Sequence, residues 1–511
     1  MTAVPGRTDR ARRWRRRGLH LVIALLLVGW CTRYVYLRLT VEPPRRVEDI
    51  FEGVTTPGPP KPDDVTAEVT EHVLALTEDV PLVLPAPPAG MRWERPQSYR
   101  QNDLDMEDVA RGEWTPADRP HLQAAITHLT DDATRQRLAA LRDLRGRPWQ
   151  YDHMRTLQDG YEGIDLTHMR EMAAHLTADA RYQHAERGDL AMAWEDLQSA
   201  LWLAQPESVD TLIVMLVRES CFYRCLTELQ HMSREHTLDD ALAADIDRVL
   251  RQLPTPSQMW SRAIAGNEVM YQTIIDTCYT RDASGHGWYV LSRQRLLMER
   301  LLTEPPGEDA AQHPLWNLTS FLYSDRRTVE AKWARYCDDL RRLPELTYAD
   351  AATEMDRLYR RTVPFSLVDG PALRYAEVSV ITHGYRRALD IGAAVDGTRL
   401  AIALSRFRSE RGVYPETLAE LTPTYIADFP LDPFGDAPFL YRRDGDGYVL
   451  YCRGRDGDDD GGVAYGAQNR SFDDYDVLYS SPRPYPKCEP ELVPTPIGQF
   501  LPEPDSEDVE P

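Results

Sequence analysis

The sequence predicts a mainly α-helical membrane protein. It would have one N-terminal transmembrane helix, a large helical and possibly repeat-like domain, and a small C-terminal α+β domain. Three observations predict this class. An arginine cluster precedes an apolar run near the N-terminus, apolar residues recur at helical spacing through the middle of the chain, and the pattern changes to one long helix and short strands after residue 385. At 511 residues and 42% hydrophobic content, the chain can form two or three domains.

Net charge and cysteine spacing exclude two classes of protein. The formal net charge is −22, which argues against nucleic acid as the main partner, because phosphate binding needs a basic face. The seven cysteines are dispersed and odd in number, with no C-x-x-C pair. This argues against a disulfide framework or a zinc site.

The N-terminal 39 residues predict a signal anchor. Residues 1–17 hold seven arginines and one acid, and are expected to stay in the cytoplasm. The 22 residues 18–39 are largely apolar, long enough to cross about 30 Å of hydrocarbon as a helix. The positive-inside rule then places the body on the far, periplasmic side of the inner (cytoplasmic) membrane, as a single-pass protein. A cleaved signal peptide is the alternative, but no small-x-small cleavage site follows at the right place.

The next segments divide into a spacer and a helical domain. Residues 40–116 are rich in proline and predict a stiff spacer with one possible helix at 63–80. Residues 117–385 predict a helical domain, interrupted by breakers such as Pro254, Pro305 and Pro364. The expected helices of this domain lie at 166–187, 189–204, 209–231, 238–253, 257–280, 289–303, 325–341 and 347–361, after a first helical stretch around residues 122–141.

The helical pair around Gly188 resembles a tetratricopeptide repeat. Gly188, Ala193, Leu197 and Ala200 match the packing positions of that repeat, although no second copy follows at the repeat distance, and an ordinary helical hairpin is an equal alternative. Residues 118–280 also loosely resemble a helical region of uncharacterised envelope proteins of planctomycete-type bacteria, a resemblance that implies no activity.

Residues 386–481 predict a separate α+β module. A long apolar helix should end at Gly412, and strands are expected at 439–442, 448–453 and 477–479. The residues Asp444-Gly445-Asp446-Gly447 predict a hairpin loop between the first two strands. Residues 482–511 are acidic and proline-rich, and we expect this tail to be disordered.

The order of motifs in this module resembles the globular part of the major (G-type) pseudopilin of type II secretion systems. The matching pieces are Tyr414-Pro415, Asp432-Pro433-Phe434-Gly435, Gly454-Arg455-Asp456-Gly457 and Asp476-Val477. The resemblance implies a loop that binds calcium and holds a small sheet together. Unlike pseudopilins, the chain has no glutamate at the fifth position of its membrane helix, Leu19-His20-Leu21-Val22-Ile23, and that helix lies far from the module.

The acidic loop is the candidate metal site on chemistry as well. Asp456, Asp458 and Asp460 alternate before Gly461, as in the opening of an EF-hand loop, but the twelfth position is Ala467 instead of glutamate. Asp474 and Asp476 would return from the next strand to complete a calcium shell. Asp459 would point away from an alternating set. A solvated acidic loop without metal is the alternative.

No catalytic motif is present, so an enzyme is not expected. The helix face of His168, Glu171 and His175, and the pair Glu268 and Asp276, are expected to be structural. The favoured function is a membrane-anchored interaction or structural protein with an unknown protein partner in the cell envelope. The alternatives are a component of a type II secretion or pilus-like machine, and an enzyme with a site in the helical domain.

Overall fold

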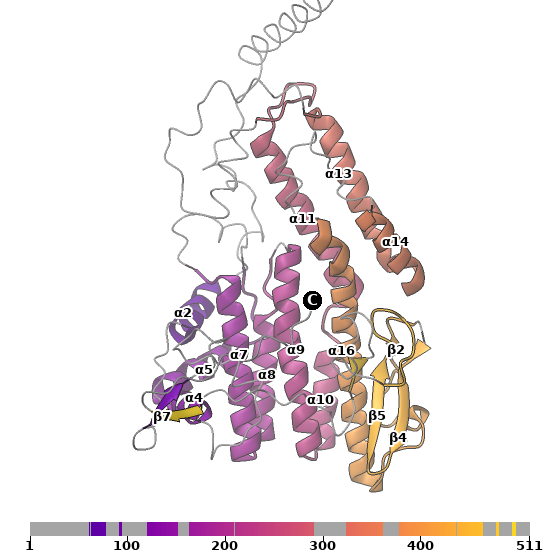
Figure 1. Cartoon of the computed structure of the whole chain (residues 1–511). Helices are drawn as coiled ribbons and strands as arrows, with labels where there is room; N and C mark the ends of the chain where they lie inside the picture. Colours follow the sequence, from indigo (N-terminus) through magenta and orange to yellow (C-terminus); the bar gives the residue numbers. More distant parts are fainter. Residues whose placement is uncertain are drawn as a thin grey trace, which may run out of the picture. The chain divides into compact units, whose positions relative to one another are not determined.

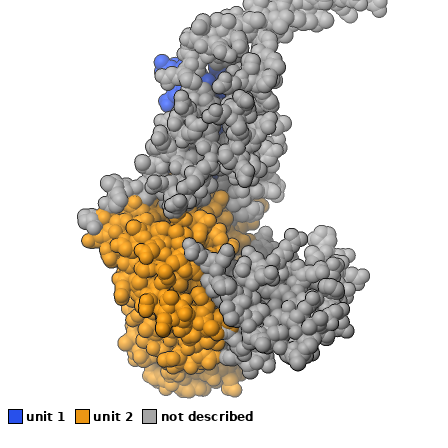
Figure 2. Space-filling view, turned by 90° about the vertical axis from the view of Figure 1, so that its left-hand side faces the viewer, with its two compact units in different colours: residues 1–55, 268–340, 358–379 blue, residues 56–267, 341–357, 380–511 orange. Residues whose placement is uncertain are grey.

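The computed structural model describes residues 61, 63–77, 91–94, 120–151, 163–208, 210–290, 323–360, 378–435, 437–462, 477–479 and 493–496. Most of them are helical, which confirms the expected mainly α class. The chain forms two compact units, coloured separately in Figure 2. Unit 1 comprises residues 1–55, 268–340 and 358–379, and unit 2 comprises residues 56–267, 341–357 and 380–511.

The helical hairpin around Gly188 forms as the sequence predicts. Helix α7 spans Leu166–Tyr182 and continues in a π-helical turn, η3, at Gln183–Arg187. Gly188 follows with a φ of 64°, a conformation that glycine adopts without steric cost. Helix α8 then spans Leu190–Leu203, and the side chain of Asp189 accepts a hydrogen bond from the Met192 amide at its start.

Helix α7 lies at the centre of the helical part of unit 2 (Figure 1). It packs against α8, α9 (Leu212–Glu235) and α2 (Thr66–Thr77), the helix expected within the spacer. Every residue from Met172 to Arg181 is buried, so α7 has no solvent face over almost three turns. The polar side chains of this stretch must therefore find partners inside the protein.

Arginines from neighbouring helices partner the buried acids. Asp179 on α7 binds Arg135 and Arg142 of α5 (Asp132–Leu144, which follows α4 at Pro120–Thr130), with closest distances of 2.6 and 2.7 Å. Arg142 also binds Asp196 on α8 at 2.6 Å. These bonds fix how α5, α7 and α8 face one another, since a buried charge that loses its partner costs about 3–5 kcal/mol.

Helix α16, Val378–Arg411, is the longest described element at 34 residues. None of its residues from Gly384 to Phe407 is exposed. On one side it contacts α9, α10 (Asp240–Leu250) and the start of α11 (Pro256–Cys278), and on the other side it faces the β-strands (Figure 1). As predicted, the helix ends before Gly412, whose φ is 75°.

Hydrogen bonds and close contacts join α16 to the rest of unit 2. Thr398 accepts from Gln230 at 2.8 Å, and Ser405 donates to the Ser233 carbonyl at 2.6 Å. Arg399 binds Asp247 of α10 at 2.8 Å. Glycines occur where neighbours come closest: a Cβ at 384 would meet Leu212 and Trp260, one at 392 would meet Pro256, and one at 397 would meet Tyr479.

The strands of the C-terminal module follow the predicted order. Strand β4, Leu440–Asp444, pairs antiparallel with β5, Gly447–Cys452, through a loop in which Asp444 is opposite Gly447. Strand β6, Val477–Leu478, pairs with the far end of β5. A short 3₁₀ helix, η8 (Leu418–Leu421), and the small pair β2 (Leu431–Asp432) and β3 (Ala437–Pro438) precede this sheet.

One strand pair corrects the expectation of disorder in the tail. Strand β7, Val493–Pro496, pairs antiparallel with β1, Met91–Glu94, from the proline-rich spacer. Both strands of such a two-stranded ribbon are edges, where proline is tolerated because its missing N–H can face away from the partner. The high proline content therefore did not preclude a strand. The pairing joins a segment of the spacer to a segment of the C-terminal tail.

In unit 1, the second half of α11 lies beside α13, Arg326–Arg341 (Figure 1). Tyr271 and Trp333 stack with ring centroids 3.9 Å apart, and Arg326 forms ion pairs with Asp276 and Glu330. Tyr289 forms an isolated antiparallel bridge with Tyr279, and the Val290 amide donates to the Cys278 carbonyl at 2.8 Å. The helix expected at 289–303 therefore does not begin at residue 289, and its residues from 291 onward lie outside the described residues. The short turn η6 at Leu343–Glu345 and most of α14, Tyr348–Arg360, belong to unit 2; α14 is the last helix predicted for the helical domain.

The predicted anchor, residues 18–39, also lies outside the described residues. Among the helices that the structure does describe, none combines the length and the apolar character needed to cross a membrane.

The first prediction concerns the close approach of α16 to the sheet. A Cβ at Gly397 would lie 2.6 Å from three ring atoms of Tyr479, whose side chain is buried. Gly397→Ala should therefore lower the free energy of unfolding by about 1–3 kcal/mol, the usual cost of overpacking, measured by urea denaturation of the full chain. In a protein that already carries Tyr479→Ala, Gly397→Ala should instead raise the free energy of unfolding, because alanine has a higher helix propensity than glycine. A penalty that persists without the ring would contradict this packing.

Candidate functional site

The acidic loop after β5 brings three of the predicted metal ligands together. Carboxylate oxygens of Asp456, Asp458 and Asp460 lie within 4.8 Å of one another. Gly457, between the first two aspartates, and Gly461, directly after the third, have positive φ values of 79° and 74°. Asp474 and Asp476, the other two predicted ligands, lie outside the described residues.

Asp459 takes a different role from its neighbours. Its Oδ1 accepts hydrogen bonds from the Tyr451 hydroxyl and from the Gly461 amide, both at 2.9 Å. The side chain therefore ties the loop to β5 and is absent from the group of three. This agrees with the expectation that an alternating set leaves Asp459 out.

Two buried contacts hold the base of the loop against α16 and α14. The Arg455 guanidinium binds Asp390 of α16 at 2.5 Å, and both side chains are almost fully buried. The Tyr348 hydroxyl donates to the Arg455 carbonyl, and the Tyr348 ring meets Phe434 edge-on at 5.1 Å. The loop is thus fixed at its first residues, while Asp456 and Asp458 remain exposed.

The Asp432-Pro433-Phe434-Gly435 turn is the second fixed point of the module. Asp432 is fully buried, and its carboxylate accepts from the Phe434 amide at 2.8 Å and from the Arg453 amide at 3.0 Å. Burial raises the pKa of Asp432, and these hydrogen bonds together with the Arg453 guanidinium oppose that rise. The aspartate in this motif therefore joins the turn to the end of β5, just before the acidic loop.

A second buried carboxylate, Glu219, lies where α9 meets α16. It pairs with Arg387 at 3.2 Å and is 4% exposed. Burial raises the pKa of Glu219 to about 7; the Arg387 charge lowers it and the Asp390 charge raises it. Glu219 is therefore a group inside the fold whose charge changes near neutral pH.

The other sequence candidates have structural roles. His168 and Asp165 form the capping box of α7, and His175 contacts the Glu171 carbonyl at 2.9 Å from a buried position. Asp276 is bound by Arg326 and Gln272. Outside these candidates, the His286 ring lies within hydrogen-bond distance of Asp325, at 2.8 Å.

The sequence analysis missed one group of possible metal ligands, formed by His184, Glu235 and His236. His184 comes from η3 and the other two from the end of α9, so more than fifty positions separate them in the chain. No fixed sequence spacing between ligands identifies such a group. Only the adjacency of Glu235 and His236 was visible in the sequence.

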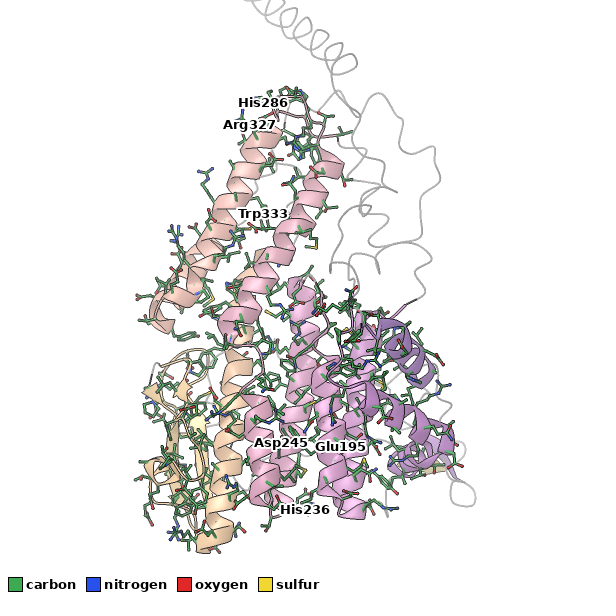
Figure 3. The ribbon with its side chains drawn as sticks, turned by 180° about the vertical axis from the view of Figure 1, so that it is seen from behind. Glu195, His236, Asp245, His286, Arg327 and Trp333 are labelled. Atoms are coloured by element: carbon green, nitrogen blue, oxygen red, sulfur yellow. The ribbon has the colours of Figure 1, made fainter. Side chains whose placement is uncertain are left out.

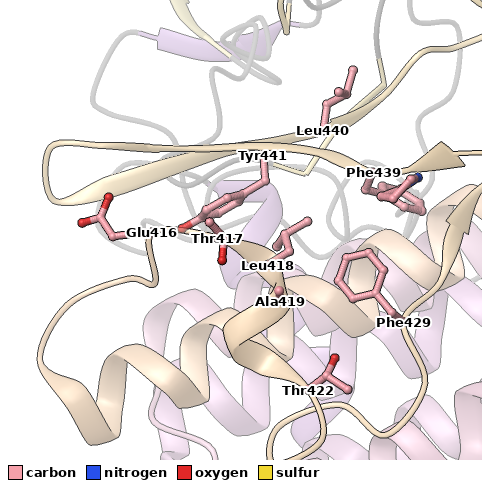
Figure 4. Close-up of a pocket in the computed structure, with 10 residues that line it drawn as sticks. Glu416, Thr417, Leu418, Ala419, Thr422, Phe429, Phe439, Leu440 and Tyr441 are labelled. Carbon is pink, nitrogen blue, oxygen red and sulfur yellow. The ribbon is translucent and has the colours of Figure 1, made fainter.

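A groove of about 560 Å³ lies in the C-terminal module between η8 and β4 (Figure 4). Phe429, Phe439, Leu418 and Tyr441 contribute most of its apolar wall. Its carboxylate, Glu416, pairs with Arg443 at 2.8 Å. The groove offers an apolar surface and hydroxyl groups, and no constellation for acid–base or nucleophilic chemistry.

Comparison of the chain with protein-family models, with curated proteins and with solved structures finds no match.

The second prediction concerns Glu219. Because its pKa is raised in the fold from 4.5 to about 7, the neutral form is the stabilising one. That contribution is present below pH 4.5 and is lost as the pH rises through about 7. We expect the free energy of unfolding to fall between pH 5 and 7, and Glu219→Gln to flatten this fall by up to about 1.4 kcal/mol per pH unit. Urea denaturation of the unaltered chain and of Glu219→Gln at several pH values measures this difference. Free energies of unfolding that change in parallel with pH in the two proteins would contradict the prediction.

Proposed function

We propose that this chain is a membrane-anchored, extracytoplasmic structural or interaction protein of the cell envelope. Residues 18–39 would hold it in the inner membrane, and the helical body would contact an unknown protein partner. The C-terminal pseudopilin-like module would be stabilised by calcium. No nucleic acid is involved in this proposal, and the acidic net charge of −22 supports that.

The burial of α16 is the observation that carries this proposal. From Gly384 to Phe407 the helix is covered by α9, α10, α11 and the sheet of the same unit. A helix with so little exposed surface offers no broad face for assembly with further copies. This supports a module that is a fixed part of the body, and it weakens the alternative of an exchangeable subunit in a type II secretion or pilus-like machine.

The buried acids of the helical body support a structural role over an enzymatic one. Asp179, Asp210 and Glu228 are each held by arginine at 2.6 Å, and all three are almost fully buried. A catalytic carboxylate must reach its substrate, whereas these side chains reach neighbouring helices. Their arrangement explains how the helices are held and provides no site for a reaction.

The metal loop supports calcium as the ion of the module. Calcium takes six to eight oxygen ligands from carboxylates, carbonyls and water. Asp456, Asp458 and Asp460 supply three carboxylates within 4.8 Å of one another, at a loop that Arg455 fixes to α16. Asp474 and Asp476 are proposed to complete the shell. A divalent cation would relieve the repulsion between these carboxylates.

The third prediction tests the membrane orientation. An enzyme that is active only outside the cytoplasm, fused after Pro511, should be active in intact cells, because the arginines before residue 18 retain the N-terminus inside. Replacing Arg12, Arg13, Arg15, Arg16 and Arg17 with serine should reduce that activity and raise the signal of a matched cytoplasmic reporter. An inactive outside reporter on the unaltered chain would refute the orientation.

The fourth prediction tests the calcium loop in the full chain, purified in detergent. Calcium at a hundred times its dissociation constant should add about 2.7 kcal/mol to the free energy of unfolding, which raises the melting temperature by roughly a few degrees in a chain this long. Asp456→Ala should remove most of the difference between calcium and a calcium chelator. Asp459→Ala is the matched control and should keep it, because that carboxylate binds Tyr451. Coincident melting curves for the unaltered chain would identify a solvated acidic loop.

A further inference from the structure

Two histidines and a glutamate converge at the end of α9. The Nδ1 atom of His184 lies 3.2 Å from Nε2 of His236 and 3.7 Å from Oε2 of Glu235. His184 is fully buried in the π-helical turn η3, a rare conformation that is frequent at functional sites. Glu235 is the last residue of α9 and His236 follows it in the chain; Figure 3 shows His236 at the end of the helical bundle.

A buried carboxylate sets the orientation of the His184 ring. Nε2 of His184 lies 2.6 Å from Glu228, which Arg181 also binds through two nitrogens at 2.6 and 2.7 Å. The two-point contact with the Arg181 guanidinium holds Glu228 as a carboxylate inside the protein. An ionised carboxylate only accepts hydrogen bonds, so Nε2 carries the proton. In the neutral ring, the lone pair of Nδ1 then points toward His236 and Glu235.

We propose that His184, Glu235 and His236 bind a divalent transition-metal ion, with zinc as the best fit. Zinc binds histidine nitrogen at about 2.0–2.1 Å in tetrahedral geometry, which separates neighbouring ligand atoms by about 3.3 Å. The observed separations of 3.2 and 3.7 Å lie on either side of that value. Two nitrogens and one carboxylate oxygen are a ligand set that zinc uses when water fills the fourth position.

The supporting hydrogen bond is of the kind that metal sites need. A histidine ligand usually donates its other ring N–H to a carboxylate, which fixes the ring and raises its basicity. The pair of His184 and Glu228 provides this inside the protein, and Arg181 in turn fixes Glu228. The cysteine pattern argued against zinc, but this site uses no cysteine.

The electrostatic surroundings favour a cation at the same place. The carbonyl end of α9 carries partial negative charge toward Glu235 and His236. A carboxylate binds metal in its ionised form and a histidine in its neutral form. The Arg181 charge is balanced by Glu228.

The ion can be tested with cobalt and zinc on the full chain, purified in detergent and treated with a chelator. Cobalt should bind at one equivalent and give the visible absorption of a tetrahedral site, and zinc should displace it. His236→Ala should weaken zinc binding by more than tenfold, since altering only an outer-shell partner already costs about 10–100-fold. Glu235→Gln, at a half-exposed position, provides a second variant that should fold and weaken binding in the same way.

Two controls locate the ion. His286→Ala removes a histidine that pairs with Asp325, and Asp456→Ala alters the calcium loop; both should keep the zinc affinity of the unaltered chain. The proposal is overturned if the unaltered chain binds no zinc at micromolar concentration, which would leave a hydrogen bond between His236 and His184. It is also overturned if His236→Ala and Glu235→Gln bind zinc normally, or if His286→Ala loses as much affinity as they do.

Discussion

The enclosure of α16, in which no residue from Gly384 to Phe407 is exposed, is the constraint on which unit 2 depends. A helix enclosed by its neighbours needs small residues where a neighbour is close, and hydrogen-bond partners for its buried polar side chains. Glycines stand where neighbours come closest, at Gly384, Gly392 and Gly397. The polar side chains of Thr398 and Arg399 bind Gln230 and Asp247, respectively. Helices α9 and α10 on one side, and the sheet with its acidic loop on the other, take their positions from the same helix.

Buried ion pairs complete the arrangement in the helical part. Asp179 with Arg135 and Arg142, and Glu228 with Arg181, each join helices that are distant in sequence. Such pairs add little net stability, but an unpaired member is costly, so they disfavour every other packing of the same helices. Glu228 has a second consequence, because it also fixes the ring of His184 and so prepares the proposed zinc site. One carboxylate thereby serves both the packing of α7 on α9 and the chemistry at their end.

Local patterns predicted the elements well and the contacts between them poorly. Gly188, Gly412 and the Asp444 to Gly447 loop marked where elements end, because backbone conformation there depends on the residues themselves. The grouping of Asp456, Asp458 and Asp460 was also visible, since one loop holds all three. His184 and His236 were not, because only the packing of α7 on α9 brings them together. The pairing of β1 with β7 was hidden for the same reason, in addition to its prolines.

Hydrogen exchange of the full chain under increasing urea tests most directly whether α16 unites the helical part and the sheet. If it does, the slowest amides of α7, α16 and β5 should converge on one opening free energy, because none of these elements can unfold while the others keep their packing. If α16 and β5 instead exchange together at clearly lower urea while α7 stays protected, the C-terminal module is an independent domain. That result would contradict the account.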